Sequence, residues 1–298
     1  MIRRLTLAWC ALVVLAVSGA HGQGAVAFDS TRAWEHLRQQ VAIGPRPSGS
    51  PGNVKNREYI TKTLAAIGLK TVEQAWTATT PLGPIKMVNL IASIPGQRAE
   101  RIIIASHFDT KLFREFRFVG ASDGASSTAA LLELARVIKA RPTLPFTIEL
   151  LFLDGEEATG EWVGTDNTYG SRHYVEVARK TGTLKSLRAM ILLDMIGDRD
   201  LNIRRESNST PWLTDIVWNV ARRLGHQRHF IEESMAVEDD HLPFLKAGVP
   251  AIDIIDLDYP AWHTAQDTLD AVSARSLQIV GDVVVAALPE IEARLLKN

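Results

Sequence analysis

Cysteine is almost absent from this sequence. Among its 298 residues there is one, Cys10, which lies inside an apolar segment near the N-terminus. The remainder of the chain therefore has no thiol for a disulfide, for a cysteine nucleophile or for thiolate binding of a metal. A remainder of about 270 residues buries enough apolar surface to be stable without such cross-links.

An excess of charge of either sign is also missing. The chain has 33 Lys and Arg against 34 Asp and Glu, which gives a formal net charge of -1, and it has no long block of one sign. Such a balance provides no basis for a nucleic-acid partner or for binding to an anionic membrane. A hydrophobic content of 46% is ordinary for a soluble globular protein.

No apolar run is long enough for a stable membrane anchor, which needs about 20 residues. The run at the N-terminus, Leu5 to Val17, follows Arg3 and Arg4 and precedes three small residues. This order predicts a secretory signal peptide over residues 1–23, and the alternative is an ordinary buried helix. We therefore expect one domain over residues 24–298, which is secreted or periplasmic and has no membrane anchor after cleavage.

Short apolar runs alternate with amphipathic segments along the chain. The runs predict strands over 88–94, 102–106, 147–153, 189–194 and 251–255, and most are continuous enough to be covered on both faces. Residues 34–41, 53–66, 125–140, 212–224 and 276–296 have the spacing of helices. The alternation predicts an α/β fold with a single mixed, mostly parallel central sheet and helices on both faces. Residues 88–94 and 102–106 are expected to be neighbouring strands, with Pro95 and Gly96 in the turn between them.

Ionisable residues stand where several of these runs end. His107 and Asp109 close one run, Glu156 and Glu157 follow another, and Asp194 ends a third. Carboxyl ends of parallel strands meet at the edge where open α/β folds hold ligands. Histidine and carboxylates are suitable ligands for Zn²⁺, so the sequence predicts a zinc site at this edge.

Asp123, Glu157 and His263 are the set that could hold one zinc ion and leave a position open. Each has an ordinary alternative: an N-cap for Asp123, a surface acidic pair for Glu156 and Glu157, and a core or surface histidine for His263. Adjacent carboxylates point in different directions, so Glu157 could face the metal while Glu156 faces a substrate.

Further residues could extend the site. His107 and Asp194, with Asp109, could complete a second metal position or form a hydrogen-bonded carboxylate network. Asp239 and Asp240 add carboxylates, or belong to a solvated acidic loop. The aromatic residues Trp162, Tyr259 and Trp262 flank these groups in sequence and could wall a small pocket, although tryptophan is as often a core residue.

These residues resemble one family, the animal-type glutaminyl-peptide cyclotransferases (glutaminyl cyclases), which share a superfamily with the zinc aminopeptidases. The resemblance covers almost the whole chain after the N-terminal segment. It rests on these motifs: Gly49-Ser-Pro-Gly52, Ser106-His-Phe-Asp-Thr-Lys111, Asp154-Gly-Glu-Glu-Ala158, Tyr169-Gly-Ser-Arg-His173, Leu193-Asp-Met-Ile-Gly197, Asp239-Asp-His-Leu-Pro-Phe244, Gly248-Val-Pro250 and Trp262-His-Thr264.

The resemblance implies a role for each matching residue. One Zn²⁺ would be held by Asp123, Glu157 and His263, and Glu156 would transfer the proton during cyclisation of an N-terminal glutamine. Asp194 and Asp239 would form the network beside Glu156, and the pocket would be lined by Trp162, Tyr259 and Trp262. Asp253 departs from the family, because the animal enzymes have a histidine there.

Two other functions are alternatives, and the first of them fits the same residues. A secreted zinc aminopeptidase would use two ions, one held by His107, Asp123 and Asp194 and the other by Asp123, Glu157 and His263. A binding protein on an enzyme-derived scaffold would lack ligands or the base, whereas all of them are present here. The expected partners are peptides or proteins that begin with Gln.

Overall fold

Residues 26–297 are described by a computed structural model. The predicted signal peptide, residues 1–23, lies outside the described residues, so its boundary and the one-domain division stay predictions. Between residues 26 and 297, no helix has both the length and the apolar composition needed to cross a membrane.

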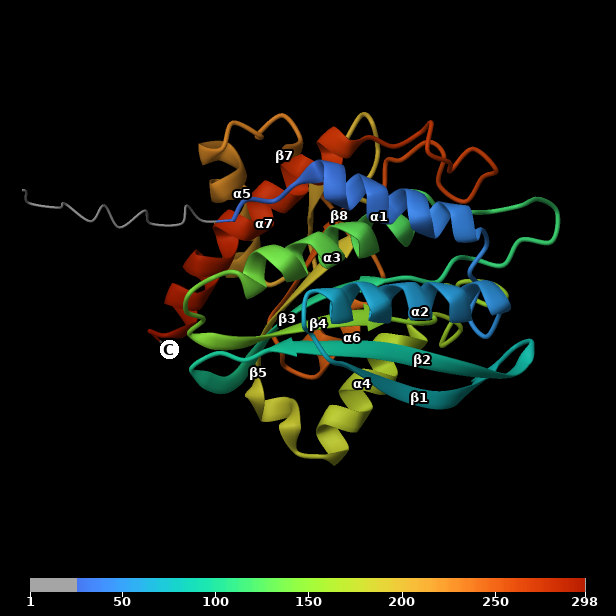
Figure 1. Ribbon diagram of the computed structural model, residues 1–298, viewed down its shortest axis with the longest axis horizontal. Coiled ribbons are helices and arrows are strands. Elements are labelled where there is room, and N and C mark those ends of the chain that lie inside the picture. Colours follow the sequence, from blue (N-terminus) through green and yellow to red (C-terminus); the bar gives the residue numbers. More distant parts are fainter. Residues whose placement is uncertain (1–25, 298) are drawn as a thin grey trace, which may run out of the picture.

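A six-stranded sheet forms the centre of the molecule (Figure 1). In spatial order its strands are β1 (Thr71–Thr80), β2 (Gly83–Ile94), β4 (Phe146–Leu153), β3 (Arg98–His107), β5 (Leu187–Asp194) and β8 (Ala251–Ile255). The last four are mutually parallel, while β1 and β2 are antiparallel to their neighbours. The predicted mixed, mostly parallel sheet is confirmed.

Helices cover both faces of this sheet. One face carries α1 (Ser30–Ile43), α2 (Pro51–Ala66), α3 (Ala125–Lys139), α5 (Pro211–Arg223) and α7 (Ala274–Leu295), and the other carries α4 (Tyr169–Lys180) and α6 (His241–Lys246). Beside them lie a short 3₁₀ turn, Thr183–Ser186, and a parallel pair, β6 (Ile203–Glu206) and β7 (Phe230–Met235).

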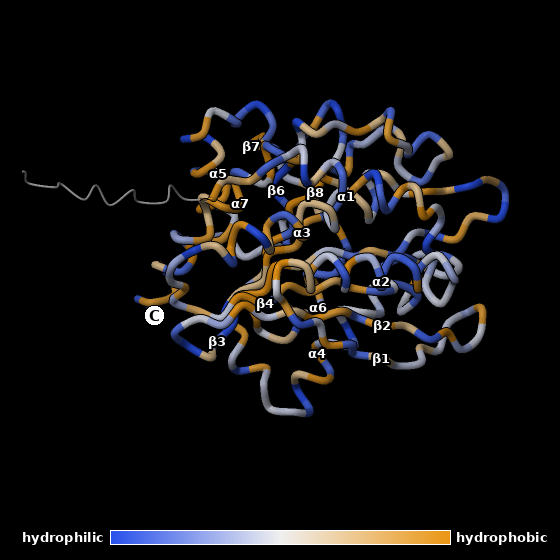
Figure 2. Tube along the Cα trace, viewed as in Figure 1, coloured by the Kyte–Doolittle hydropathy of each residue, from blue (hydrophilic) through white to orange (hydrophobic). Residues whose placement is uncertain are grey.

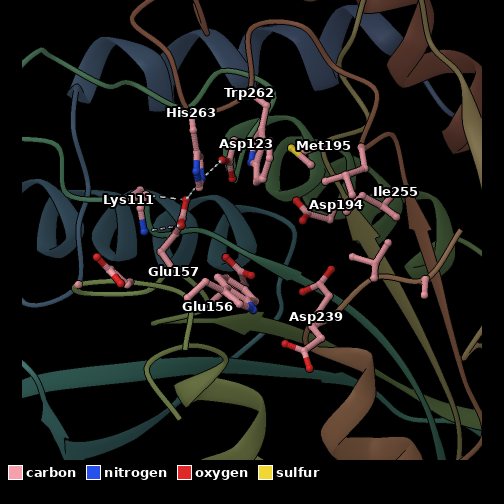
Figure 3. Close-up of a pocket in the computed structure, with 17 residues that line it drawn as sticks. Lys111, Asp123, Glu156, Glu157, Asp194, Met195, Asp239, Ile255, Trp262 and His263 are labelled. Atoms are coloured by element: carbon pink, nitrogen blue, oxygen red, sulfur yellow. Dashed lines mark hydrogen bonds and ion pairs between the residues drawn. The ribbon is translucent and has the colours of Figure 1, made fainter. Parts of the chain in front are cut away.

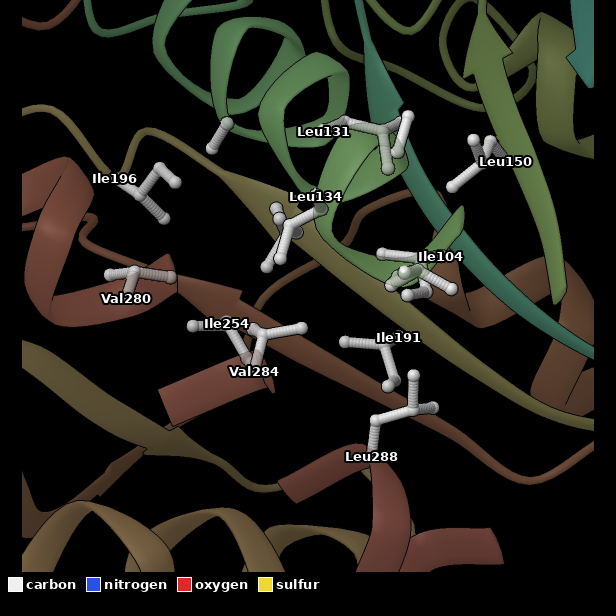
Figure 4. Packing of buried hydrophobic residues seen from close by; sticks show 14 of the residues in the cluster. Ile104, Leu131, Leu134, Leu150, Ile191, Ile196, Ile254, Val280, Val284 and Leu288 are labelled. Carbon is white, nitrogen blue, oxygen red and sulfur yellow. The ribbon is translucent and has the colours of Figure 1, made fainter. Parts of the chain in front are cut away.

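Alternation along the strands divides the core in two. Ile104 and Ile191 point to the larger layer, where they pack with Leu134 of α3 and Val284 of α7 (Figure 4). Ile103 points to the opposite layer under α4 and α6. Figure 2 shows the apolar residues gathered along β3 and β4 in the interior. Because both faces are buried, these strands read as continuous apolar runs.

The expected pairing of β2 with β3 is wrong, because β4 lies between them. The Pro95-Gly96 connection passes over the start of β4, where Gln97 N donates to Leu144 O at 2.8 Å. A Cβ on Gly96 would lie 2.2 Å from Phe146 O, so only glycine fits this crossing. The two strands are close in sequence, but the better partner for each is β4.

Candidate active site

The carboxyl edge of the parallel strands gathers the predicted ionisable residues. His107 is the last residue of β3, Asp194 is the last of β5, and Asp154 directly follows β4. Loops that leave the same edge supply Asp123, Glu156, Glu157 and His263, and the segment between β7 and α6 supplies Asp239. Figure 3 shows most of these side chains pointing toward a common space. The sheet thus brings together residues that are up to 156 positions apart, from His107 to His263.

Asp123, Glu157 and His263 form one cluster. His263 Nε2 lies 3.3 Å from Asp123 Oδ2 and 3.2 Å from Glu157 Oε1, and one ligand atom of each residue lies within 4.8 Å of the others. These separations match the edge of a tetrahedron with metal bonds of about 2.0 Å. Asp123 Oδ2 and Glu157 Oε2 are buried and have no hydrogen-bond partner among residues 26–297, which is the condition a cation would relieve. The cluster therefore fits a zinc ion.

Asp123 is not the cap of the helix that follows it. The N-cap of α3 is Gly124, and no side chain caps the helix. The Asp123 carboxylate instead faces His107 and His263, while its backbone amide donates to Asp267 Oδ2 at 3.2 Å. Gly124 has a φ of +83°, and a Cβ there would lie 2.5 Å from Asp109 O. The tight turn at Gly124 therefore aims Asp123 into the site.

His263 is held in an unusual backbone conformation, with a φ of +53°. Phe113 and Phe118 contact its ring edge-on at centroid distances of 5.5 and 5.9 Å, and Trp262 stacks on it at 4.5 Å. Positive φ in a residue other than glycine costs free energy, and residues strained in this way cluster at functional sites. The aromatic contacts fix the imidazole toward Asp123 and Glu157.

Glu156 and Glu157 face different neighbours, as the sequence predicted. Both backbone amides donate to Asp109, at 3.2 and 3.3 Å. Glu157 Oε1 then meets His263 and the amide of Lys111, whereas Glu156 Oε2 lies 3.8 Å from His107 Nδ1. Asp109, already singled out in the sequence, thus positions both members of the pair.

Burial changes the acidity of both glutamates. It raises the pKa of Glu157 to about 7, with the nearby Asp123 charge adding to the effect and His263 opposing it. Burial also raises the pKa of Glu156 well above its ordinary value, and His107 opposes this rise while Glu157 and Asp239 reinforce it. A carboxylate with a raised pKa is suited to exchanging protons near neutral pH.

His107 lies between the metal cluster and the inner carboxylates. Its Nε2 is 3.1 Å from Asp194 Oδ1 and 3.3 Å from Asp123 Oδ1. His107, Asp123 and Asp194 therefore make a second group of close ligand atoms. The structure brings together both predicted sets, and Asp123 is common to them.

Behind Asp194 is a buried acidic group that includes Asp239 and Asp253. Burial raises the pKa of Asp253 well above its ordinary value, and the charge of Asp239 adds to this. His241 Nε2 meets Glu206 Oε2 at 3.0 Å, while its Nδ1 is 3.7 Å from Asp253 Oδ2. Asp253 therefore occupies the inner network in which the sequence indicated a departure from the animal enzymes. Glu206 was missed, because nothing in its local sequence marks it.

A cavity of about 520 Å³ opens over the cluster. Trp162 and Trp262 both line it, and so do Glu156, Asp194 and Asp239. Its remaining lining residues are Lys111, Asp123, Glu157, Gly160, Glu161, Met195, Ala236, Val237, Glu238, Ile255, Leu257 and His263. Catalytic candidates, metal cluster and aromatic walls thus share one space.

Tyr259 was expected to line the pocket, but it is not among the lining residues. Tyr259 is buried among Met195, Val237 and Ile255, and its hydroxyl donates to Asp267 Oδ1 at 2.7 Å. Asp267 also accepts from the backbone amide of Asp123. A phenolic hydroxyl needs a partner when buried, and here Asp267 attracts it away from the cavity.

These features define the class: an α/β protein of the zinc aminopeptidase-like type, with its site at the carboxyl edge of the central sheet. Residues 89–288 match peptidase family M28. A Bos taurus protein called glutaminyl-peptide cyclotransferase-like is 32% identical over 270 residues, which cover 80% of this chain and 70% of that one.

Solved structures agree with this relationship. An Acidobacteriales bacterium glutaminyl cyclase is 41% identical with a TM-score of 0.87, over 95% of this chain and 100% of that chain. A leucine aminopeptidase precursor from Bacteroides thetaiotaomicron is 29% identical with a TM-score of 0.81, over 89% of this chain and 98% of that chain. The chain belongs to peptidase family M28 and, within it, to the glutaminyl cyclases.

Proposed function

We propose that this protein cyclises N-terminal glutaminyl residues of peptides and proteins to pyroglutamate and releases ammonia. The observation that carries the proposal is the placement of Glu156 beside the Asp123–Glu157–His263 cluster, within a cavity that also has Trp162 in its wall. Membership of the glutaminyl cyclases supports this reaction over the peptide hydrolysis that the family name and the leucine aminopeptidase precursor suggest.

Asp123, Glu157 and His263 would hold one zinc ion. When bound there, zinc supplies Lewis-acid polarisation of the side-chain amide oxygen of the substrate glutamine. The side chains of this cluster are buried or half-buried and converge on one point, which gives the substrate amide a fixed location.

Glu156 would move the proton. The α-amine nitrogen attacks the side-chain amide carbon, so one C–N bond forms within the residue and the bond to the departing nitrogen breaks. Glu156 takes a proton from the attacking amine and returns it to the leaving nitrogen, which departs as ammonia. Asp194 and Asp239 line the same cavity, and the negative charge of each raises the pKa of Glu156. The two aspartates would thereby help Glu156 to bind the proton that it takes from the amine.

The tryptophans would enclose the bent glutamine. Trp162 and Trp262 line the cavity, and large flat walls favour a compact conformer while they exclude water. The amine and the amide carbon belong to one residue, so the reaction is intramolecular in any setting, and the pocket contributes by holding the bent conformer in which the two atoms approach each other. Cyclisation needs no activated water, so a single ion is sufficient for it. We propose one zinc rather than the two of an aminopeptidase.

The setting of the reaction would be outside the cytoplasm. A basic start followed by Leu5 to Val17 and small residues supports export through a signal peptide. Peptides and proteins that begin with Gln would be met in the periplasm or after secretion.

A pair of substitutions tests the division of labour. Glu156→Gln should retain zinc and lose about 10²- to 10⁴-fold in cyclisation rate, the range of one proton-transfer group. Its neighbour provides the matched control, because Glu157→Gln should release zinc at chelator concentrations at which the wild type retains it. Metal content and ammonia release measure the two effects. Near-normal turnover in Glu156→Gln would remove this residue from its role.

A further inference from the structure

The residues that line the cavity differ in solvent exposure: we call the buried ones its floor and the exposed ones its rim. Asp123 and Glu157 at the floor are 3–4% exposed, whereas Glu161 and Glu238 are exposed residues of the same lining. Glu161 belongs to the loop after β4, and Glu238 belongs to the segment between β7 and α6. If glutamine occupies the floor, the chain that follows it leaves through the exposed part of the lining, where these two residues are the acidic ones and Trp262 is the exposed aromatic one.

Neither rim carboxylate is neutralised by a lysine or arginine of the described part of the chain. Within residues 26–297, no ion pair or side-chain hydrogen bond involves Glu161 or Glu238, although many other surface glutamates are paired with arginine. The one lysine or arginine among the lining residues is Lys111. Its Nζ donates to Ala158 O at 3.1 Å and lies 4.0 Å from Glu157 Oε2, so its charge is directed inward.

We propose that Glu161 and Glu238 determine substrate preference, and that this enzyme favours Gln-initiated peptides with Lys or Arg at the second or third position. The inference rests on the proposed cyclase function and adds its substrate class. A cationic side chain beyond the glutamine would meet two free carboxylates, while an acidic one would be repelled by both. Because the rim does not touch the reacting atoms, the preference acts on KM and kcat/KM rather than on kcat.

Matched peptides measure the preference. Gln-Lys, Gln-Ala and Gln-Glu peptides, identical afterwards and amidated, are compared by ammonia release at low and high salt. Exposed charge pairs of this kind each alter binding by a few-fold, so we expect kcat/KM to fall by about 3- to 10-fold at each step from Lys to Ala to Glu. The differences should shrink as salt screens the rim.

Two variants assign the effect to the rim. Glu161→Gln combined with Glu238→Gln should reduce the Lys-to-Glu ratio toward one. Glu58→Gln removes an exposed glutamate of α2 that is not among the lining residues of this cavity, and it should leave the ratio unchanged. A wild-type ratio near one, or a ratio that survives in the double variant, would overturn the preference while Gln-Ala cyclisation still supported the function. Absence of ammonia from Gln-Ala would overturn both.

Discussion

Glu156 and Glu157 are adjacent in sequence and have different neighbours in space. Their two amides donate to the two oxygens of one carboxylate, that of Asp109, so the backbone is fixed and the side chains diverge. The sequence could indicate this division, because adjacent residues in a non-helical segment point apart. It could not indicate the acidity of the pair, which depends on burial and on carboxylates from three other segments.

Tyr259 shows why pocket residues are harder to assign from sequence. Its position near Trp262 suggested a wall, but its hydroxyl bonds to Asp267, which also receives the amide of Asp123. An aromatic residue next to a site residue is equally able to support the site from behind. Only the direction of the side chain distinguishes these roles, and local sequence does not contain it.

Replacement of Tyr259 by Phe tests its supporting role. The change leaves Asp267 with its two backbone donors and removes the third, which should cost about 1 kcal/mol of unfolding free energy. Zinc affinity should fall by about 10-fold, as for other residues that orient metal ligands. A chelator competition measures the affinity. Unchanged zinc affinity with a raised KM would instead place Tyr259 against the substrate.

At the level of elements, apolar runs and helical spacing were sufficient to locate the parallel core strands and five of the helices. The edge strand β1 was missed because it is largely polar and exposed, with burial limited to Ala78 and Thr80. The helices α4 and α6 and the β6–β7 pair were missed as well. Their short, mixed sequences acquire regular structure from packing against the sheet, which no local window shows.

The turn at Gly124 is the element-scale feature on which the metal cluster depends. Gly124→Ala would force a side chain into positive φ and place its Cβ 2.5 Å from Asp109 O and 3.2 Å from His107 Cε1. We expect a loss of about 2–4 kcal/mol in unfolding free energy together with weaker zinc binding.

Gly225→Ala is the matched control for this substitution. Gly225 has a nearly equal φ, +79°, but a Cβ there meets nothing within 4 Å. Gly225→Ala should therefore lower the unfolding free energy only by the cost of a positive φ in alanine, about 1 kcal/mol. Equal losses for the two variants in denaturant unfolding would show that the contact with Asp109 and His107 is unimportant.

Many aspartate and glutamate side chains are buried in this molecule. Burial raises the pKa of Asp256 to about 7, although the amide of Asn202 opposes the rise, and burial with the Asp109 charge raises the pKa of Asp154 to about 7. An unfolded aspartate titrates near 3.9. Between these values the folded chain holds protons that the unfolded chain has lost, so stability decreases as pH rises.

Metal-free protein should therefore have a larger unfolding free energy at pH 5 than at pH 8. Asp256→Asn replaces one of these acids by a neutral group, and the decrease from pH 5 to pH 8 should become smaller in this variant. The exposed substitution Asp270→Asn serves as control. Denaturant unfolding at the two pH values measures the difference, and an equal decrease in all three proteins would contradict the role given to Asp256.

The central claim is that the buried cluster and its aromatic cavity cyclise an N-terminal glutamine. The most direct test incubates the zinc-loaded protein with a Gln-initiated peptide and with the same peptide beginning with Leu, followed by mass spectrometry. We expect the Gln peptide to lose the mass of one ammonia with its remaining sequence intact, and the Leu peptide to stay unchanged. Release of the first residue as a free amino acid from either peptide would contradict the account and indicate a two-metal aminopeptidase.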